Sequence, residues 1–341
     1  MGEKIAVVTG AAGFIGSHMV DLLLERGFRV HGIDNLSSGR EANLAHCRSH
    51  PNLNFVVGDI RDIEQGDPLF AGASYVFHFA GMGDIVPSIE RPVDYLSTNV
   101  MGTVRVLEAS RHAGVSKFIY AASSSCYGLA TELPTQESSL IDPQYPYALS
   151  KYLGEQAAFH WGKVYHLPVI SIRMFNVYGP RSRTSGAYGA VFGVFLAQKL
   201  AGKPFTIVGD GSQTRDFVFV TDVVKAYLAA AESNRDAEVY NLGAGSPESV
   251  NRLVELLGTE EIVYVPKRPG EPDCTWADIS KITAHLNWRP EVTFETGVRT
   301  MLQNIDYWRS APLWDPTSIG KATETWFMML SDQRRPASPK K

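Results

Sequence analysis

The feature that most constrains the fold is a glycine-rich junction close to the start of the chain. A short apolar, β-branched run at 5–9 leads directly into a segment with glycines at 10, 13 and 16. This spacing is typical of a strand that turns tightly into a helix, since Gly10 and Gly13 permit the turn and Gly16 lets the helix pack closely on the strand. The positive end of the helix dipole then faces the turn and favours a bound pyrophosphate. We therefore predict a dinucleotide-binding turn contacted by Gly10, Gly13, Phe14, Ile15 and Gly16.

An acidic residue at the end of the second predicted strand narrows the choice of dinucleotide. Asp34, followed by Asn35, lies about 20 residues beyond the glycines, where a carboxylate accepts both adenosine ribose hydroxyls and repels a 2′-phosphate. NAD is therefore favoured over NADP. Two further strand ends supply cofactor contacts: Asp59 and Ile60, then Phe79, Ala80 and Gly81. Asp59 could bind the adenine amino group, or it could equally be a helix N-cap.

The hydrophobic pattern alternates between strands and helices. Strands are predicted at 5–9, 30–34, 55–57, 75–79, 118–121 and 169–174, with helices at 15–26, 93–113 and 147–165. This alternation predicts an α/β fold with a Rossmann-type, doubly wound parallel sheet. A smaller α/β lobe is expected from helices at 190–201, 221–232, 249–257, 294–308 and 318–330 and strands at 205–208 and 238–242. We expect 1–180 to bind NAD, 181–331 to be mainly a substrate-binding lobe, and 332–341 to be a disordered tail.

Composition excludes several classes of protein. The 341 residues include 32 basic and 36 acidic side chains, a net charge of −4, so no overall positive field would attract nucleic acid. No stretch reaches the ~20 apolar residues of a membrane-spanning helix. The three cysteines, Cys47, Cys126 and Cys274, form no closely spaced pair, so neither a disulfide framework nor a cysteine metal site is expected. A cytoplasmic protein without a metal fits best.

A tyrosine and a lysine form the candidate catalytic pair. Tyr147 and Lys151 follow Pro146, which suits a first helical position, and their spacing puts both on one helix face. Lys151 is expected to lower the pKa of the phenol and make Tyr147 a general acid and base. Ser123 and Ser125 lie in a serine cluster at the end of the fifth predicted strand, where they either offer hydroxyls to a substrate or cap the strand end.

With these motifs the chain resembles the extended short-chain dehydrogenase/reductase family, in particular its NAD-dependent nucleotide-sugar epimerases and dehydratases. The further matching segments are 99–103, 173–181, 209–217 and 268–271. The resemblance implies tightly bound NAD, with Asn99 among its contacts. It also implies a homodimer joined through helices 93–113 and 147–165, and a role in nucleotide-sugar metabolism and polysaccharide biosynthesis.

The resemblance also implies roles at the substrate. Ser123 resembles the hydroxyl that bonds the sugar O4, Tyr147 the base, and Lys151 the lysine that binds the ribose. Asn176 resembles a residue near the diphosphate of the substrate. Arg215 and Arg268 match the pair that neutralises this diphosphate, in keeping with the bidentate geometry of guanidinium groups.

Departures from the family patterns narrow the reaction. Dehydratases of the family carry Asp-Glu after the catalytic hydroxyl residue, whereas this chain has Ser124 and Ser125, and the decarboxylase glutamate is also missing. Gly83 stands where some epimerases carry lysine. The resemblance therefore implies inversion of C4 in a UDP-sugar through a transient 4-keto sugar. A 4-ketoreductase, dehydrogenase or decarboxylase is the alternative, and an NAD sensor without turnover is the remote one.

Two residues bear on the choice of sugar. Thr275 resembles the position where 4-epimerases carry a tyrosine or a small residue, and a small one leaves room beside the sugar. Arg183 could bind a C6 carboxylate bidentately, or it could be a solvated loop residue. UDP-glucuronate or a hexose substituted at C2 or C6 is therefore a candidate substrate.

Overall fold

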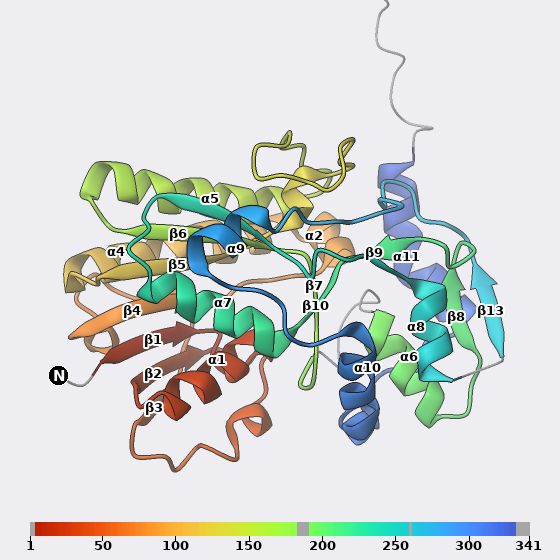
Figure 1. Ribbon diagram of the computed structural model, residues 1–341, viewed down its shortest axis with the longest axis horizontal. Helices are drawn as coiled ribbons and strands as arrows, with labels where there is room; N and C mark the ends of the chain where they lie inside the picture. The colour runs from red at the N-terminus through yellow and green to blue at the C-terminus, as the bar shows by residue number, and fades with distance from the viewer. Residues whose placement is uncertain (1–3, 183–190, 259–260, 332–341) are drawn as a thin grey trace, which may run out of the picture.

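The computed structural model describes residues 4–182, 191–258 and 261–331. Its centre is a seven-stranded sheet in the order β11-β6-β5-β4-β1-β2-β3, with every neighbouring pair parallel (Figure 1). The strands are β1 (Ile5–Thr9), β2 (Arg29–Asp34), β3 (Leu53–Val57), β4 (Ala73–His78), β5 (Lys117–Ser123), β6 (Val169–Met174) and β11 (Glu238–Leu242). The predicted Rossmann-type α/β fold is confirmed.

Helices cover both faces of this sheet. The helices of this layer are α1 (Phe14–Glu25), α2 (Ile85–Glu90), α3 (Pro92–Leu96), α4 (Thr103–Ala113), α5 (Pro146–Tyr165), α7 (Val220–Glu232) and α9 (Ser280–Leu286). Alternate residues of one strand enter opposite cores: Val8 packs with α1 and α7, whereas Val7 packs with α4 and α5. Successive side chains of a strand point to opposite faces of the sheet. Because helices bury both faces, residues on both sides are apolar, and each strand appears in the sequence as a continuous apolar run.

The smaller lobe has its own aromatic core. Its elements are β8 (Phe205–Val208), β13 (Ile262–Val265), α6 (Val191–Leu200), α8 (Val250–Leu257), α10 (Phe294–Gln303) and α11 (Pro316–Leu330). Short pairs join β7 (Asn176–Tyr178) to β10 (Phe217–Phe219) and β9 (Thr214–Arg215) to β12 (Glu248–Ser249). Tyr178, Phe192 and Phe217 lie in this core, where the rings of Tyr178 and Phe192 stack with centroids 4.6 Å apart.

Several sequence predictions need correction. Residues 238–242 form a strand as predicted, but β11 pairs with β6 at the edge of the main sheet, so its assignment to the smaller lobe was wrong. Helix 221–232 likewise belongs to the sheet layer, since Val223 and Tyr227 of α7 share a core with α1. A buried strand looks alike in either layer, so the sequence pattern alone does not assign it to a sheet.

Two predicted helices are also interrupted. Segment 93–113 contains a π-helical turn at Ser97–Gly102, and 294–308 ends as α10 at Gln303 before a 3₁₀ turn at Ile305–Trp308. None of the helices in the described ranges combines the length and apolar character needed to cross a membrane.

Candidate active site

The glycine turn between β1 and α1 brings the backbone close to the neighbouring strand. Gly10 has φ +70°, and a Cβ there would lie 2.8 Å from the amide nitrogen of Ala80. A Cβ at Gly16 would lie 2.0 Å from the carbonyl oxygen of Gly10. Gly13 is the N-cap of α1, and Phe14 and Ile15 are the first residues of this helix. The turn therefore forms a cradle that any side chain at these positions would fill.

Asp34 lies at the end of β2, where it is 8% exposed. Its carboxylate accepts hydrogen bonds from the amides of Ala12 (3.0 Å) and Leu36 (2.8 Å). Burial raises its pKa, and these backbone bonds oppose the rise. The carboxylate borders a cavity of about 360 Å³ that also contacts the glycine turn and the ends of β3 and β4; its lining includes Gly10, Asp34, Asn35, Ile60, Phe79, Ala80 and Gly81.

This cavity fits the NAD predicted from the sequence. It joins a glycine cradle, which suits a pyrophosphate, to a buried acceptor carboxylate, which suits a ribose diol. Predicted residues at the ends of four strands, β1 to β4, therefore come together at this cavity. Other predicted cofactor residues are not part of its lining: Gly13, Phe14, Ile15, Gly16, Asp59 and Asn99.

Asp59 and Asn99 are held by protein groups in the structure. Asp59 caps the short turn Ile60–Asp62 and pairs through both carboxylate oxygens with Arg61, which holds the pKa of Asp59 well below its usual range. The N-cap alternative is thus observed. Asn99, in the π turn, bonds to both backbone groups of Met82 and to the Ser150 hydroxyl. Its contacts position the loop after β4, and a direct cofactor contact stays a prediction for both residues.

Tyr147 and Lys151 lie in the first turns of α5, as predicted. The Lys151 Nζ atom lies 4.8 Å from the centroid of the Tyr120 ring, and a Cβ at Gly81 would lie 3.7 Å from it. The ammonium is therefore next to the mouth of the cofactor cavity. Burial lowers the pKa of Lys151 to about 8, while the nearby Glu155 carboxylate opposes this shift.

The pKa of Tyr147 differs from the sequence expectation. Burial raises this pKa, and the opposing contribution is a hydrogen bond with Ser123. The lowering expected from Lys151 is not among the contributions to this pKa, and the net shift is upward because the loss of solvation outweighs the bond with Ser123. Ser123, and not the lysine, is the group whose contact favours the phenolate.

The serine cluster has the predicted capping role, and the offer of hydroxyls to a substrate stays a prediction. The Ser123 hydroxyl accepts a hydrogen bond from the Ser125 amide (3.2 Å) and so caps the turn Ser124–Tyr127. It also lies 3.0 Å from the Ser125 hydroxyl, and when Ser125 is the donor of this bond the Ser123 proton is available to Tyr147. Ser124 and Ser125 nevertheless border a second cavity, next to Tyr147. The cap therefore keeps Ser124 and Ser125 at the edge of this cavity, whereas Ser123 is not part of its lining.

The second cavity, of about 470 Å³, lies between the sheet layer and the smaller lobe. Its lining includes six predicted site residues, Ser125, Tyr147, Asn176, Arg215, Arg268 and Thr275. Residues 81–84 separate it from the cofactor cavity, since Gly81 and Met82 border one and Gly83 and Asp84 the other. Tyr147 borders the second cavity, and its ring contacts Tyr95, whose hydroxyl accepts a hydrogen bond from the Asp84 amide; Tyr147 is therefore next to the boundary between the two spaces. Arg183 lies outside the described residues.

Three further residues that line this cavity were not among the predicted site residues. Glu271 pairs with both arginines, at 2.9 Å from Arg215 and 3.0 Å from Arg268. Tyr145 stacks on Tyr147 with ring centroids 6.3 Å apart and an interplanar angle of 8°. Trp326 reaches the cavity from α11. Glu271 could have been found from its place beside Arg268 in sequence, but Trp326 is remote from every motif.

Thr275 has a polar partner as well as a small side chain. Its hydroxyl donates to the Asn176 side-chain oxygen (2.8 Å) and accepts from the Asp216 amide (3.2 Å). The first bond identifies the oxygen of the Asn176 amide and leaves its NH₂ group to face other partners. Thr275 therefore orients Asn176 in addition to leaving space.

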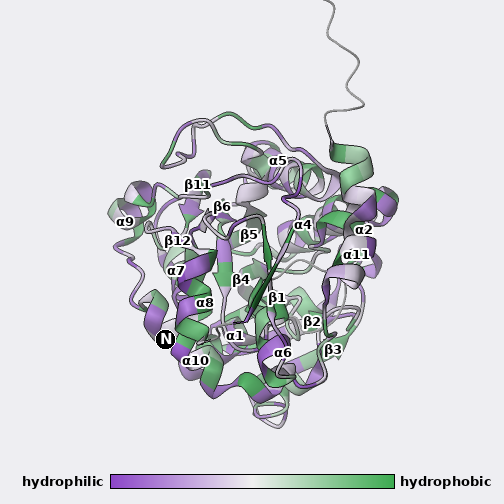
Figure 2. Cartoon of the chain, turned by 90° about the vertical axis from the view of Figure 1, so that its right-hand side faces the viewer, coloured by the Kyte–Doolittle hydropathy of each residue, from purple (hydrophilic) through white to green (hydrophobic). Residues whose placement is uncertain are grey.

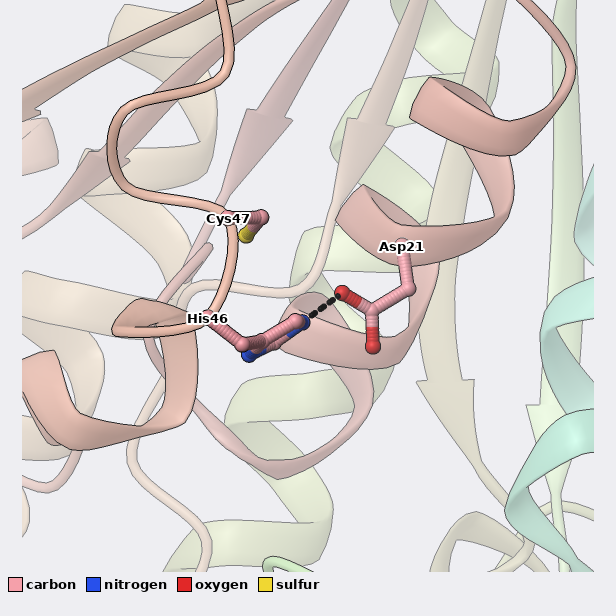
Figure 3. A group of neighbouring side chains, drawn as sticks. All are labelled: Asp21, His46 and Cys47. Atoms are coloured by element: carbon pink, nitrogen blue, oxygen red, sulfur yellow. Dashed lines mark hydrogen bonds and ion pairs between the residues drawn. The ribbon is translucent and has the colours of Figure 1, made fainter.

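One group of described side chains has metal-ligand character: Asp21, His46 and Cys47, whose ligand atoms lie within 4.8 Å of one another (Figure 3). Asp21 is already shared, because one carboxylate oxygen lies 2.7 Å from His46 and the other 2.7 Å from Arg181. Burial raises the pKa of the Cys47 thiol, which disfavours the thiolate that a metal requires. We assign no metal to this group.

Comparison with known proteins places these features in context. Residues 6–243 match the model of the NAD dependent epimerase/dehydratase family. A putative UDP-glucose 4-epimerase of Methanocaldococcus jannaschii is 37% identical over 303 residues, covering 87% of this chain and 96% of that protein. A UDP-glucose 4-epimerase of Mycolicibacterium smegmatis is 36% identical, covering 89% of this chain and 98% of that protein.

Solved structures show the same similarity over most of the chain. The UDP-N-acetylglucosamine 4-epimerase of Methanobrevibacter ruminantium, in complex with UDP-N-acetylmuramic acid, has a TM-score of 0.84 and 33% identity, covering 91% of this chain and 99% of that one. The UDP-glucuronic acid 4-epimerase of Bacillus cereus, in complex with UDP-glucuronic acid and NAD, has a TM-score of 0.82 and 32% identity, covering 89% and 99%.

Proposed function

Because the chain belongs to the NAD-dependent epimerase/dehydratase family, we propose that it inverts C4 of a UDP-sugar with NAD, through a transient 4-keto sugar. The observation that supports this most is the position of Tyr147 beside the boundary of two cavities. One cavity has the glycine cradle and Asp34, and the other has paired arginines. A group that exchanges a proton with a sugar hydroxyl must face both the cofactor and the substrate.

Different residues of the chain have different roles in the proposed reaction. NAD, when bound, supplies the acceptor and donor of the C4 hydride. Tyr147 takes the proton of the 4-hydroxyl and returns it, aided by the hydrogen bond with Ser123 that favours the phenolate. Lys151 places a positive charge beside the cofactor cavity below about pH 8. Arg215 and Arg268 hold the diphosphate, so the sugar can present its other face without leaving.

The residues beside the reacting tyrosine support epimerisation over elimination. Elimination of water needs a carboxylate next to the catalytic hydroxyl, and the chain has Ser124 and Ser125 there, both bordering the cavity. The small Thr275 side chain supports a sugar enlarged at C2 or C6. Within this proposal 1–180 binds NAD and 181–331 mainly binds the nucleotide sugar, with α7 and β11 returned to the sheet layer.

We further propose a homodimer formed through the helical face of α3, α4 and α5. Val93 is 75% exposed and Met101 57%, on one helical segment, and Leu149 and Leu153 on α5 are 42% and 37% exposed. Such an apolar face is typical of a surface covered by a partner. Sedimentation at micromolar concentration should give a dimer, and a monomer alone would exclude this face as an interface. Cytoplasmic location and polysaccharide biosynthesis stay predictions.

The reaction can be tested with purified protein and UDP-glucose, UDP-N-acetylglucosamine and UDP-glucuronate in parallel. Proton NMR should show a C4 epimer of at least one sugar, with no added NADH. Tyr147→Phe should abolish conversion, whereas Tyr165→Phe, at the exposed far end of the same helix, should leave it unchanged. Consumption of NADH would indicate a ketoreductase, release of CO₂ a decarboxylase, and no conversion of any sugar would refute the proposal.

A further inference from the structure

The C-terminal helix α11 connects the smaller lobe to the sheet layer. Its start is fixed by a capping box between Asp315 and Ser318, and Ile319 packs in the core of the lobe. Near its other end, Thr325 donates a hydrogen bond to Glu90 of α2 (3.1 Å). Figures 1 and 2 both show α11 beside α2. The helix borders the substrate cavity through Trp326.

Trp326 is the residue through which α11 reaches this cavity. The residue is 3% exposed, and its ring contacts both Arg268 and Tyr145. The guanidinium carbon of Arg268 lies 5.1 Å from the Trp326 ring centroid, and the Tyr145 ring centroid lies 6.5 Å away. The indole nitrogen donates to the Pro269 carbonyl oxygen (2.7 Å). Trp326 thus holds both the side chain of Arg268 and the backbone that follows it.

The geometry of this contact matters for an arginine that must bind phosphate. A Glu271 carboxylate oxygen lies 3.0 Å from Arg268 Nε as an ion pair, but outside hydrogen-bond geometry. An incoming diphosphate would need the N–H edge of the guanidinium, because phosphate oxygens accept from the N–H groups. A ring face holds the guanidinium through its plane, and so does not compete for these donors. It can therefore keep the side chain in place while the anion at its edge changes.

We propose that Trp326 is a positioning residue that holds Arg268 in its binding orientation for the diphosphate of the nucleotide sugar. This inference rests on the proposed function. It assigns a role to a helix that the sequence analysis predicted at 318–330 without giving it one. Tyr145 contacts Trp326 and also stacks on Tyr147, so a continuous row of aromatic rings links Trp326 to the proposed catalytic tyrosine.

The test uses the full-length protein and UDP as the probe, with binding followed by calorimetry. Trp326→Ala should weaken UDP binding roughly two- to thirty-fold, the range of a cation–π contact. It should raise the KM for the nucleotide sugar by a similar factor while kcat changes less. Trp326→Phe keeps a ring but not the indole donor, and it should restore part of the affinity. Met329→Ala, at an exposed position of the same helix, is the matched control and should bind UDP normally.

A double-mutant cycle separates positioning from a general loss of stability. If Trp326 acts through Arg268, then Arg268→Gln combined with Trp326→Phe should lose no more UDP affinity than Arg268→Gln alone. Additive losses would overturn the inference, as would unchanged UDP affinity in both Trp326 variants. Failure of the wild-type protein to bind UDP would instead refute the proposed function. Thermal melting of each variant shows whether the fold is intact, and Trp326→Phe carries the test if Trp326→Ala does not fold.

Discussion

A buried ion pair next to the catalytic helix gives a quantitative test of how the fold is held together. Arg173 of β6 and Glu155 of α5 have side chains 6% and 1% exposed, and their nearest atoms lie 2.6 Å apart. A second bond joins Arg173 Nε to Glu155 (3.0 Å), and Arg173 also donates to the Tyr127 hydroxyl (2.8 Å). The Ser171 hydroxyl donates to Glu155 (2.8 Å). The pair therefore joins the sheet to α5, one turn beyond Lys151.

Arg173→Met should destabilise the protein strongly, because it removes the direct ion-pair partner of Glu155. The buried carboxylate then keeps only the Ser171 hydroxyl as a bonded donor and the nearby Lys151 ammonium as a partial counter-charge. Breaking such a pair costs about 3–5 kcal/mol. For a chain of 341 residues the entropy of unfolding is roughly 0.7 kcal/mol/K, which converts this cost into a fall in melting temperature of about 4–7 °C. Urea and thermal unfolding, followed by tryptophan fluorescence, measure the two quantities independently.

The double variant Arg173→Met with Glu155→Leu decides between competing explanations. If the uncompensated charge is the cause, the double variant should be more stable than Arg173→Met alone. The control is the Arg111 to Glu108 pair on α4, whose side chains are 33% and 31% exposed. Arg111→Met should lower the free energy of unfolding much less than Arg173→Met does. A loss below about 1 kcal/mol for Arg173→Met, or strictly additive losses in the double variant, would refute this reasoning.

Three further predictions concern the cofactor side. Lys151 loses its proton near pH 8 when folded and near pH 10.5 when unfolded, so its contribution to stability rises over that interval. Lys151→Met should therefore be more stable than the wild type by about 3 kcal/mol below pH 8, and this difference should shrink toward pH 10.5. A stability difference that stays constant between pH 7 and pH 10.5, measured by thermal melting, would contradict the lowered pKa of Lys151. Asp34→Ala should weaken NAD binding at least roughly tenfold and reduce discrimination against NADP, as measured by titration of cofactor-free protein; equal NAD affinity would remove Asp34 from the site. Gly16→Ala should cost about 3 kcal/mol or more and impair NAD binding, since its Cβ would meet the Gly10 carbonyl oxygen at 2.0 Å; a wild-type melting temperature would show that α1 can move without cost.

The sequence predicts local structure and motif positions well, because these depend on neighbouring residues. The strand at 5–9, the glycine turn and the helix that begins at Pro146 all follow from local patterns. The partners of β11 and the position of Trp326 do not, since both depend on contacts between distant segments. The pKa of Tyr147 was misjudged for a related reason: spacing on a helix identifies a neighbour, but the burial of the phenol is set by the whole fold.

The carboxylate of Glu271 gives the two arginines of the cavity an internal counterion. Because Arg215 and Arg268 both pair with it, a diphosphate that binds as proposed would exchange one anion for another instead of meeting two unpaired cations. The Glu271 carboxylate thus cancels part of the electrostatic attraction between the arginines and the diphosphate. UDP should therefore bind with a weaker dependence on ionic strength than it would to two unpaired arginines. The same carboxylate is available to re-pair with the guanidinium groups as the product leaves, which favours rapid release over tight retention.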